Sequence, residues 1–455
     1  MNLPDYFLAD LPPEAELTAG LLRDACETLK RNRDQYLAAR TTSAMVGLLV
    51  EVARSWLRTD YPLRRCALDR GPSATGFSRA TLSRGLDSFF STLTPEGFKA
   101  LLEQDLGHPD RLDRFCCTNA EQGSNRLAMA TGPRFLVHIA AGNVPNPVLL
   151  SMVLGLLLRS AQFVKCATGT ALLPRLFAHS LYDADPKLGS CLEVAEWKGG
   201  NTLLEGVLFE AADCVTATGS DETLSSVRQR LPPTARFVGY GHKLSVAYVS
   251  AEALSASSWR NTLERAADDI VAWNQLGCLS PHVLYVQDGG TAGPENFAEA
   301  LAAVLASREQ SEPRGELPDK TAAAIASRRS IYELRAAHDP GTRLWSSKGS
   351  TAWTVVYEAD SPVQLSCLHR FIYVKLVKDL AAALQNADPF RGKVSTVGLA
   401  GADHELQSLA TLLAAWGVPR VCPLGRMQNP PLAWRHDGRL SLEALATWTD
   451  WEQGR

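Results

Sequence analysis

The stretch that decides the fold is RFLVHIAAGNVPNPVLLSMVLGLLLRSAQFVKCA, residues 134–167. Its two ends, Arg134–Ala140 and Gln162–Ala167, are short apolar runs typical of buried strands. The apolar run Pro147–Leu158 spans about a dozen residues, whereas a membrane span needs about 20. The segment Pro147–Ser160 therefore predicts a buried helix. A strand, a helix and a strand in this order predict a parallel βαβ unit.

The same alternation continues toward the C-terminus. Further strands are predicted at Asp213–Thr218, Arg236–Gly239 and Leu244–Ser250. A second block with the same rhythm opens with a predicted helix at Trp259–Gln275 and a strand at His282–Gln287. This pattern favours parallel sheets with helices on both faces.

The N-terminal part has a different texture. Residues 1–130 look mainly helical, with apolar residues at three- and four-residue spacing in Leu17–Leu37. A further helix is predicted over Phe98–Phe115, and Gly71–Thr81 predicts a turn-rich break. We therefore expect an α/β protein with an N-terminal helical region and boundaries near residues 130, 250 and 425.

Composition excludes several classes of protein. The formal net charge of −3, from 46 basic and 49 acidic residues, gives no reason to expect nucleic acid or an acidic membrane as partner. The N-terminus lacks the basic region of a signal peptide. The ten cysteines include no C-x-x-C pair and no histidine-containing cluster at metal-ligand spacing. We expect reduced thiols in a cytoplasmic protein, with no metal and no membrane span.

Three widespread nucleotide or hydrolase motifs are missing. The sequence contains no G-x-G-x-x-G, no G-x-x-x-x-G-K-[ST] and no G-x-S-x-G. A plain Rossmann dehydrogenase, a P-loop ATPase and an α/β-hydrolase therefore lose support.

Four short segments carry chemistry. Asn143 follows a strand, where it acts either as a helix N-cap or as an amide donor to an oxyanion. Lys165 ends the next strand, and Thr218-Gly219-Ser220 forms a turn before a helix whose N-terminus suits a pyrophosphate. Cys278 stands on a turn between a helix and a strand, where a thiol meets substrates more readily than in a core.

In this order the four segments resemble the aldehyde-dehydrogenase superfamily. Three longer stretches resemble the acyl-CoA reductase family typified by the fatty acid reductase of bacterial bioluminescence: HIAAGNVP (138–145), NQLGCLSP (274–281) and GRMQNPPLAWRHDG (425–438). The similarity runs from roughly residue 85 to the end. It implies an aldehyde-dehydrogenase-like fold with two Rossmann-type domains.

The resemblance assigns roles to segments and residues. It implies four parts. Residues 1–130 are expected to form a helical region packed on the cofactor domain, and residues 131–250 the NAD(P)-binding domain. Residues 251–425 are expected to form the catalytic domain, and residues 426–455 a tail. Cys278 becomes the nucleophile and Asn143 the oxyanion donor, and we expect the two to converge on one carbonyl. The residues implied in cofactor binding are Lys165, Thr168, Thr218, Gly219, Ser220 and Gly241.

Two departures from ordinary aldehyde dehydrogenases narrow the activity. Where those enzymes carry a water-activating Glu, this chain has Gly239-Tyr240-Gly241-His242-Lys243, with no acid. This favours acyl transfer or reduction over hydrolysis. Three residues after Lys165, Thr168 replaces the Glu that grips ribose hydroxyls in NAD-specific members. We therefore expect NADPH, with NADH as the alternative.

The implied activity is reduction of an acyl-CoA, or of an acyl group on a carrier protein, to an aldehyde. His242, His282 and His369 are candidate proton donors, but satisfied or surface histidines explain each of them more simply. An acyl-activating ligase partner and a homo-oligomer are also implied. Two alternatives stay open: a CoA-acylating aldehyde dehydrogenase working oxidatively, and a non-catalytic nucleotide-binding scaffold.

Overall fold

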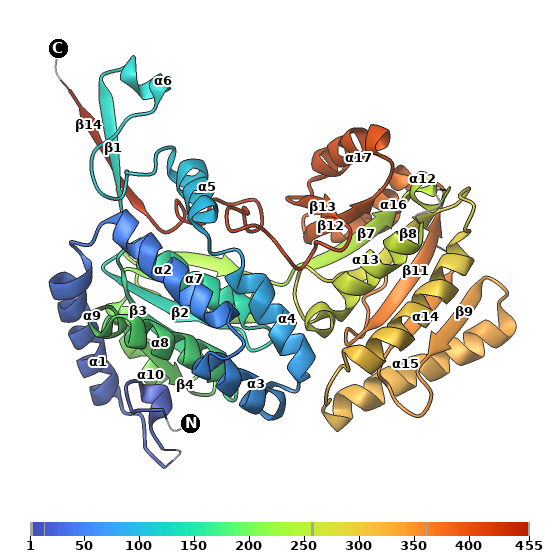
Figure 1. Cartoon of the computed structure of the whole chain (residues 1–455), viewed down its shortest axis with the longest axis horizontal. Helices are drawn as coiled ribbons and strands as arrows, with labels where there is room; N and C mark the ends of the chain where they lie inside the picture. The colour runs from blue at the N-terminus through green and yellow to red at the C-terminus, as the bar shows by residue number, and fades with distance from the viewer. Residues whose placement is uncertain (1–2, 13, 256–258, 361, 454–455) are drawn as a thin grey trace. The chain divides into compact units, whose positions relative to one another are not determined.

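Three β-sheets organise the computed structural model, which describes residues 3–12, 14–255, 259–360 and 362–453 (Figure 1). The strands are β1 (Arg126–Thr131), β2 (Phe135–Ile139), β3 (Ala161–Cys166), β4 (Leu192–Glu196), β5 (Cys214–Thr218), β6 (Arg236–Tyr240), β7 (Leu244–Val249), β8 (Pro281–Gln287), β9 (Thr342–Ser346), β10 (Thr354–Glu358), β11 (Phe371–Val377), β12 (Val394–Ala400), β13 (Val421–Pro423) and β14 (Thr447–Glu452).

Helices precede and separate these strands. They are α1 (Ala19–Asn32), α2 (Thr42–Leu57), α3 (Pro62–Thr75), α4 (Arg79–Phe90), α5 (Pro95–Leu106), α6 (Asn119–Gln122), α7 (Asn146–Leu157), α8 (Leu172–Ala184), α9 (Pro186–Gly189), α10 (Thr202–Ala211), α11 (Asp221–Arg230), α12 (Ala251–Ser255), α13 (Trp259–Val271), α14 (Pro294–Ser311), α15 (Asp319–His338), α16 (Leu380–Ala387) and α17 (Asp403–Trp416), with short helices η1 (Leu8–Asp10), η2 (Arg33–Leu37), η3 (Ala272–Gln275) and η4 (Asp388–Phe390).

Chain contacts divide these elements between two compact units. Unit 1 comprises Met1–Thr75, Leu86–Gly241 and Pro431–Arg455, and unit 2 comprises Gly76–Gly85 and His242–Pro430. The domain boundaries that we expect near residues 130, 250 and 425 stay a prediction.

The five-stranded sheet of unit 1 has the order β4-β3-β2-β5-β6, and all its pairings are parallel. The chain starts at β2 and builds outward twice, so the strand order reverses between β2 and β5. This reversal is the topological switch point at which open α/β sheets bind ligands. Helices α1 and α10 pack on one face, and α7 and α8 lie on the other (Figure 1).

The seven-stranded sheet of unit 2 has the order β13-β12-β7-β8-β11-β10-β9 and is parallel except for the edge strand β9. Alternate residues of its strands face opposite cores. Val249 and Val286 pack with α13 and α14, whereas Tyr248 and Tyr285 pack with α15, α16 and α17. Both faces are covered, which explains the apolar composition of these strands.

A two-stranded antiparallel ribbon completes unit 1. Strand β1 pairs with β14 along its whole length, from Arg126 opposite Glu452 to Thr131 opposite Thr447. Figure 1 shows this ribbon extending away from the body of its unit. All six residues of β14 are exposed, so they lack the alternation that would have marked the strand in the sequence.

Two predictions for the N-terminal region are wrong. The helix expected over Phe98–Phe115 ends at Leu106, because Gly107 adopts a left-handed conformation with φ 74° and caps it. The break expected at Gly71–Thr81 begins only after Thr75. Helix α3 runs through Pro72, which removes one backbone hydrogen bond near the end of the helix, and packs on α8.

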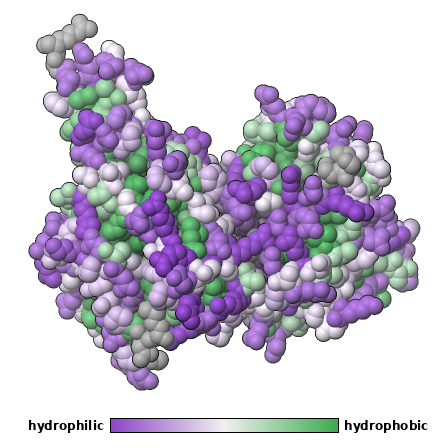
Figure 2. Space-filling model, in the orientation of Figure 1, coloured by the Kyte–Doolittle hydropathy of each residue, from purple (hydrophilic) through white to green (hydrophobic). Residues whose placement is uncertain are grey.

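The hydropathy of the surface agrees with the composition of the chain. The visible face is mainly hydrophilic, with apolar patches scattered over it (Figure 2). Within the described residues, no helix is both long and apolar enough to cross a membrane.

Candidate active site

The carboxyl ends of four parallel strands form one edge of the unit 1 sheet. Ile139 lies in register with Lys165 on one side and with Ala217 on the other, and Thr218 pairs with Tyr240. The turns after β2, β3, β5 and β6 therefore lie side by side. This edge brings together the expected residues Asn143, Lys165, Thr168, Thr218, Gly219, Ser220 and Gly241.

Asn143 is exposed in the turn between β2 and α7. The N-cap of α7 is Pro145, and no side chain caps the helix. The N-cap interpretation of Asn143 is therefore wrong. Among the described residues, no hydrogen bond involves the Asn143 side chain, so its amide N–H groups can reach a ligand outside the fold.

A small pocket opens beneath the Asn143 turn, at the switch point. Its lining includes Ile139, Val144, Pro147, Ser151, Thr216 and Thr218. Thr216 also contacts His138 (2.7 Å), whose other ring nitrogen lies 2.8 Å from Gln162 Oε1. Burial lowers the pKa of His138 to about 4, so this imidazole is neutral at pH 7. The pocket is therefore walled by uncharged groups.

One buried atom in the first turn of α7 lacks a partner among the described residues. Asn146 Oδ1 accepts no hydrogen bond, and a buried polar atom without a partner is costly. A hydroxyl donor, such as a ribose of a dinucleotide, would satisfy it. The nearby helix N-terminus suits a phosphate, so the residues at this edge fit a nicotinamide dinucleotide.

Lys165 is a buried side chain, not a solvated one. It is 3% exposed, and its Nζ lies 5.7 Å from the centroid of the Trp197 ring. Burial lowers the pKa of Lys165, and the charges of Glu205 and Glu196 partly oppose this. Such a cation is worth more to a ligand phosphate than a solvated one, because water screens it less.

Sequence reasoning missed an acid at the same edge. Glu196 ends β4, and its carboxylate accepts hydrogen bonds from the backbone N–H of Gly169 (2.7 Å) and Ala171 (3.1 Å). It therefore holds the turn that follows Thr168. The alternation in LEVAE (192–196) was the available signal for this strand. Thr168 removes one acid from the turn, but Glu196 supplies a negative charge from the neighbouring strand.

The turn after β5 behaves as its sequence predicts. Ser220 caps α11 through a hydrogen bond from Thr223 N–H to its Oγ (3.3 Å). Gly219 N–H donates to the Tyr240 carbonyl (3.2 Å). A Cβ at Gly241 would lie 2.6 Å from Asp221 Oδ1, so a side chain there would require Asp221 to move. The first turn of α11 is thereby held against the end of β6.

In unit 2, Cys278 differs from the other nine cysteines. It is the exposed one, whereas Cys117 and Cys367 are half-buried and the remaining seven are buried. Burial raises the pKa of the Cys26 and Cys166 thiols to about 12, which keeps both protonated at pH 7. Cys278 is therefore the thiol best placed to react as a nucleophile.

The helix expected over Trp259–Gln275 ends at Val271, so that prediction is wrong. Trp273, Asn274 and Gln275 adopt left-handed conformations, with φ of 50°, 50° and 63°. Such residues cost about 1–3 kcal/mol each and persist where the surroundings hold them. Here the chain leaves the helix direction at Trp273, five residues before Cys278.

A second left-handed run holds the first. Leu368, His369 and Arg370 have φ of 60°, 55° and 65°. His369 N–H donates to the Asn274 carbonyl (2.8 Å), and Arg370 Nε donates to Asn274 Oδ1 (3.1 Å). The Asn274 amide in turn donates to the Arg314 carbonyl (2.9 Å). Asn274 is thus the point at which the two runs are joined.

Of the three histidines named as proton donors, His282 is buried and His369 is half-buried. Burial lowers the pKa of His282 to about 4, and the charge of His242 lowers it further. Burial likewise lowers the pKa of His369 to about 4, helped by Arg314. Both rings are neutral at pH 7, which disfavours them as acids.

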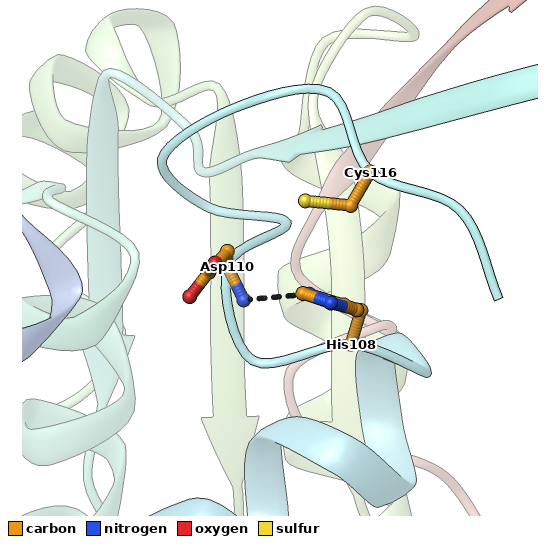
Figure 3. Close-up of side chains that lie close together, drawn as sticks. All are labelled: His108, Asp110 and Cys116. Carbon is orange, nitrogen blue, oxygen red and sulfur yellow. Dashed lines mark hydrogen bonds between the residues drawn. The ribbon is translucent and has the colours of Figure 1, made fainter.

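A possible metal-binding cluster lies in unit 1, where His108, Asp110 and Cys116 place one ligand atom each within 4.8 Å of one another (Figure 3). His108 Nδ1 accepts a hydrogen bond from Asp110 N–H (3.2 Å), so the neutral ring carries its proton on Nε2. Asp110 pairs with Arg114 at 2.5 Å, and burial raises the pKa of the Cys116 thiol. The Asp110 carboxylate is thus already paired, and the Cys116 thiol donates to the Arg114 carbonyl (3.5 Å), which disfavours a metal centre.

Solved structures show the class of fold. The putative aldehyde dehydrogenase PutA from Anabaena variabilis has a TM-score of 0.70 at 15% identity, covering 96% of this chain and 93% of that one. An NAD-dependent benzaldehyde dehydrogenase from Corynebacterium glutamicum has a TM-score of 0.69 at 13% identity, covering 96% and 91%. A bifunctional proline utilization A protein has a TM-score of 0.70 at 16% identity, and this chain spans 45% of its length. The expected aldehyde-dehydrogenase-like α/β fold is confirmed.

Sequence comparison then identifies the family. The pattern of the acyl-CoA reductase (LuxC) family matches residues 37–448, and the chain belongs to this family. Long-chain acyl-protein thioester reductases from Photorhabdus laumondii and Aliivibrio fischeri are each 22% identical to it, over 419 and 424 residues, covering 90% of this chain and 82% of those proteins. The resemblance inferred from the sequence is confirmed, and the family and fold together imply an oxidoreductase with a nicotinamide cofactor.

Proposed function

We propose that this chain reduces an acyl thioester to an aldehyde through a covalent thioester on Cys278, with NADPH as the hydride donor. The observation that carries the proposal is the exposure of Cys278 on its turn while the other cysteines are buried or half-buried. The substrate is an acyl-CoA or an acyl group on a carrier protein, in keeping with the names of the family and of its relatives.

The first step forms the acyl-enzyme. The Cys278 thiolate attacks the thioester carbonyl, and the CoA or carrier thiolate leaves. A nearby cation favours the thiolate. Burial lowers the pKa of Arg420, while Asp269 and Cys278, when ionised, oppose that effect. Arg420 therefore lies within electrostatic reach of the Cys278 sulfur.

The oxyanion formed in this attack needs hydrogen-bond donors. We assign this role to the Asn143 side-chain amide and the Cys278 backbone N–H. The free amide of Asn143 at its turn supports the assignment. Its convergence with Cys278 on one carbonyl stays a prediction.

The second step reduces the acyl-enzyme. When bound, a nicotinamide cofactor would supply the hydride that reduces the acyl carbon. The resulting thiohemiacetal loses its C–S bond, which releases the aldehyde and returns the Cys278 thiolate. One thioester, one NADPH and one proton thus give one aldehyde, one thiol and one NADP⁺. The segment 239–243 offers no carboxylate to activate water, which supports reduction over hydrolysis.

Two charges at the unit 1 edge bear on the choice of cofactor. Lys165 and the missing acid at Thr168 favour the 2′-phosphate of NADPH. Glu196 opposes it from β4. We propose NADPH because the Glu196 carboxylate already accepts two backbone hydrogen bonds, and NADH remains the alternative.

Mass spectrometry of the acyl-enzyme tests the proposal. Wild-type protein incubated with octanoyl-CoA should gain one acyl mass on the peptide that carries Cys278, and NADPH should remove it. The variant Cys278→Ala should gain no acyl mass and oxidise no NADPH, because its nucleophile is gone. Cys367→Ala, which removes a half-buried thiol of the same unit, should behave as wild type. Acylation of Cys278→Ala would remove this residue from the role.

The same residues would serve a CoA-acylating aldehyde dehydrogenase. Faster NAD reduction with acetaldehyde and CoA than NADPH oxidation with octanoyl-CoA would favour that activity. Nucleotide binding without either turnover would favour a non-catalytic scaffold. An acyl-activating ligase as partner and assembly into a homo-oligomer stay predictions.

A further inference from the structure

The segment after β13 packs against the turn that carries Cys278. We call residues 424–430 the brace loop; their sequence is LGRMQNP. The family resemblance includes this segment but assigns it no role. Its contacts within unit 2 suggest a role.

Two buried ionisable groups fix the backbone of the brace loop. Asp269, on α13, accepts hydrogen bonds from Gly425 N–H (2.5 Å) and Met427 N–H (2.9 Å). Arg420 donates to the carbonyls of Met427 (2.7 Å) and Arg426 (2.9 Å). Two N–H groups and two carbonyls of the loop are therefore bonded by buried side chains, which makes the loop a rigid support.

Met427 adds a packing anchor to this support. It is fully buried, and its sulfur lies against Gly398 of β12, where a Cβ would come within 2.5 Å. A loop anchored through hydrogen bonds and through a buried side chain projects its next residue, Gln428, in a defined direction.

Gln428 reaches the nucleophile turn. Its Nε2 donates to Ser280 Oγ, and Ser280 is 1% exposed. The same amide lies against Gly277, where a Cβ would come 2.8 Å from both Nε2 and Oε1. Gln428 therefore contacts both residues that flank the Cys278–Leu279 pair.

The opposite side of the turn is also held. Ser245, on β7, donates from its Oγ to the Cys278 carbonyl (2.7 Å), and Ser280 N–H donates to the Gly277 carbonyl (3.0 Å). The backbone around Cys278 is thus bonded on both sides, while the Cys278 side chain stays exposed.

We propose that Gln428 is a positioning residue for the nucleophile: it fixes the Gly277–Ser280 turn so that the Cys278 thiol meets the thioester carbonyl in the reactive orientation. The inference rests on the proposed function. A glycine-containing turn is flexible by itself, and a misplacement of about 1 Å costs on the order of 100-fold in rate. A hydrogen bond from an anchored loop removes that freedom.

Gln428→Ala and Ser280→Ala test the role, with Gln407→Ala, an exposed glutamine of α17, as the control. Each test variant should lose about 10- to 100-fold in kcat for octanoyl-CoA and NADPH, with KM changed less than about threefold. The double variant should be no worse than either single one, because both remove the same contact. The control should match wild type. Wild-type kcat in Gln428→Ala, or fully multiplied losses in the double variant, would overturn the inference.

The pH dependence of alkylation separates positioning from mere stability. Gln428→Glu keeps an acceptor for the Ser280 hydroxyl and adds a negative charge beside the turn. The rate of iodoacetamide labelling at Cys278, followed on its own peptide, should therefore rise at higher pH than in wild type, and kcat should recover at high pH. A labelling profile identical to that of wild type would contradict the proposed contact.

A steric variant keeps the test valid if Gln428→Ala does not fold. Gly277→Ala retains every hydrogen-bonding group but directs a methyl group into the Gln428 amide. It should be slow, and Gly277→Ala/Gln428→Ala should be faster than Gly277→Ala alone because the space is restored. Full activity of Gly277→Ala would overturn the inference. Iodoacetamide labelling needs no acyl substrate, so it still reports on positioning if wild-type Cys278 gains no acyl mass and the proposed function fails.

Discussion

The two sheets of this protein carry the residues of the candidate site at opposite ends of their strands. In the five-stranded sheet, Asn143 and Thr218 lie at or just beyond the carboxyl ends of β2 and β5. In the seven-stranded sheet, Cys278 and His369 precede the amino ends of β8 and β11. The first edge is the usual ligand-binding edge of an open α/β sheet, and the second is not.

The two edges also differ in their backbone. Nine described non-glycine residues have positive φ, and six of them form the runs 273–275 and 368–370 of unit 2. The cofactor edge of unit 1 is built instead from extended strands, helix N-termini and a capping serine. The candidate cofactor edge thus rests on common local structure, whereas the turn that carries Cys278 follows a strained backbone run held by distant side chains.

Asn143→Ala should give the largest effect in unit 1. Removal of one oxyanion donor typically costs about 10²–10³ in kcat, and the exposed side chain leaves the melting temperature unchanged. Steady-state NADPH oxidation and thermal unfolding measure the two quantities. Asn143→Asp keeps the size but has no N–H donor, so it should lose as much. Retained turnover in the Asp variant would show that donation is not the role of this residue.

Asn274→Ala should give the largest effect on stability in unit 2. It removes two buried hydrogen bonds, to Arg314 and from Arg370, and leaves their partners unsatisfied. We expect the free energy of unfolding to fall by about 2–4 kcal/mol in urea titrations followed by tryptophan fluorescence. Asn274→Gly loses the same bonds but relieves the left-handed backbone, so it should recover about 1 kcal/mol. An equal decrease in the free energy of unfolding in both variants would mean that the backbone strain is not stored at residue 274.

Glu196→Gln should give the smallest effect and should confine it to the cofactor. Loss of one negative charge at the unit 1 edge should raise the ratio of kcat/KM for NADPH over NADH about tenfold, equivalent to about 1.4 kcal/mol. Glu210→Gln, an exposed acid on α10, is the matched control and should leave the ratio unchanged. An unchanged ratio in Glu196→Gln would place the ribose away from β4.

Local sequence predicted the cofactor side well. The strands expected at Arg134–Ala140 and Gln162–Ala167 appear as β2 and β3, within one residue at each end, and the helix between them appears as α7. These segments are mostly apolar because they are buried on both faces, so their own composition predicts them. The turn at Gly219 was also predictable from its own local sequence.

The nucleophile side could be predicted only in part. Cys278 was recognisable from its neighbours in sequence, but the left-handed run before it was not. Asn274 continues a helical pattern, and it leaves the helix because Arg314 and Arg370 bond its side chain. Gln428 likewise acts across 148 residues, on Ser280. Such contacts follow from the tertiary fold and leave no periodic trace in the sequence.

The pairing of β1 with β14 has a consequence for biosynthesis. Besides this ribbon, Asp105 accepts a hydrogen bond from Leu442 N–H (2.7 Å), and Arg236 donates to the Ala446 carbonyl (2.5 Å). In each of these contacts, one partner precedes residue 242 in the chain and the other follows residue 430. During translation, unit 1 therefore cannot complete its ribbon until unit 2 has been synthesised. Until then, the edge of β1 that pairs with β14 has no partner strand.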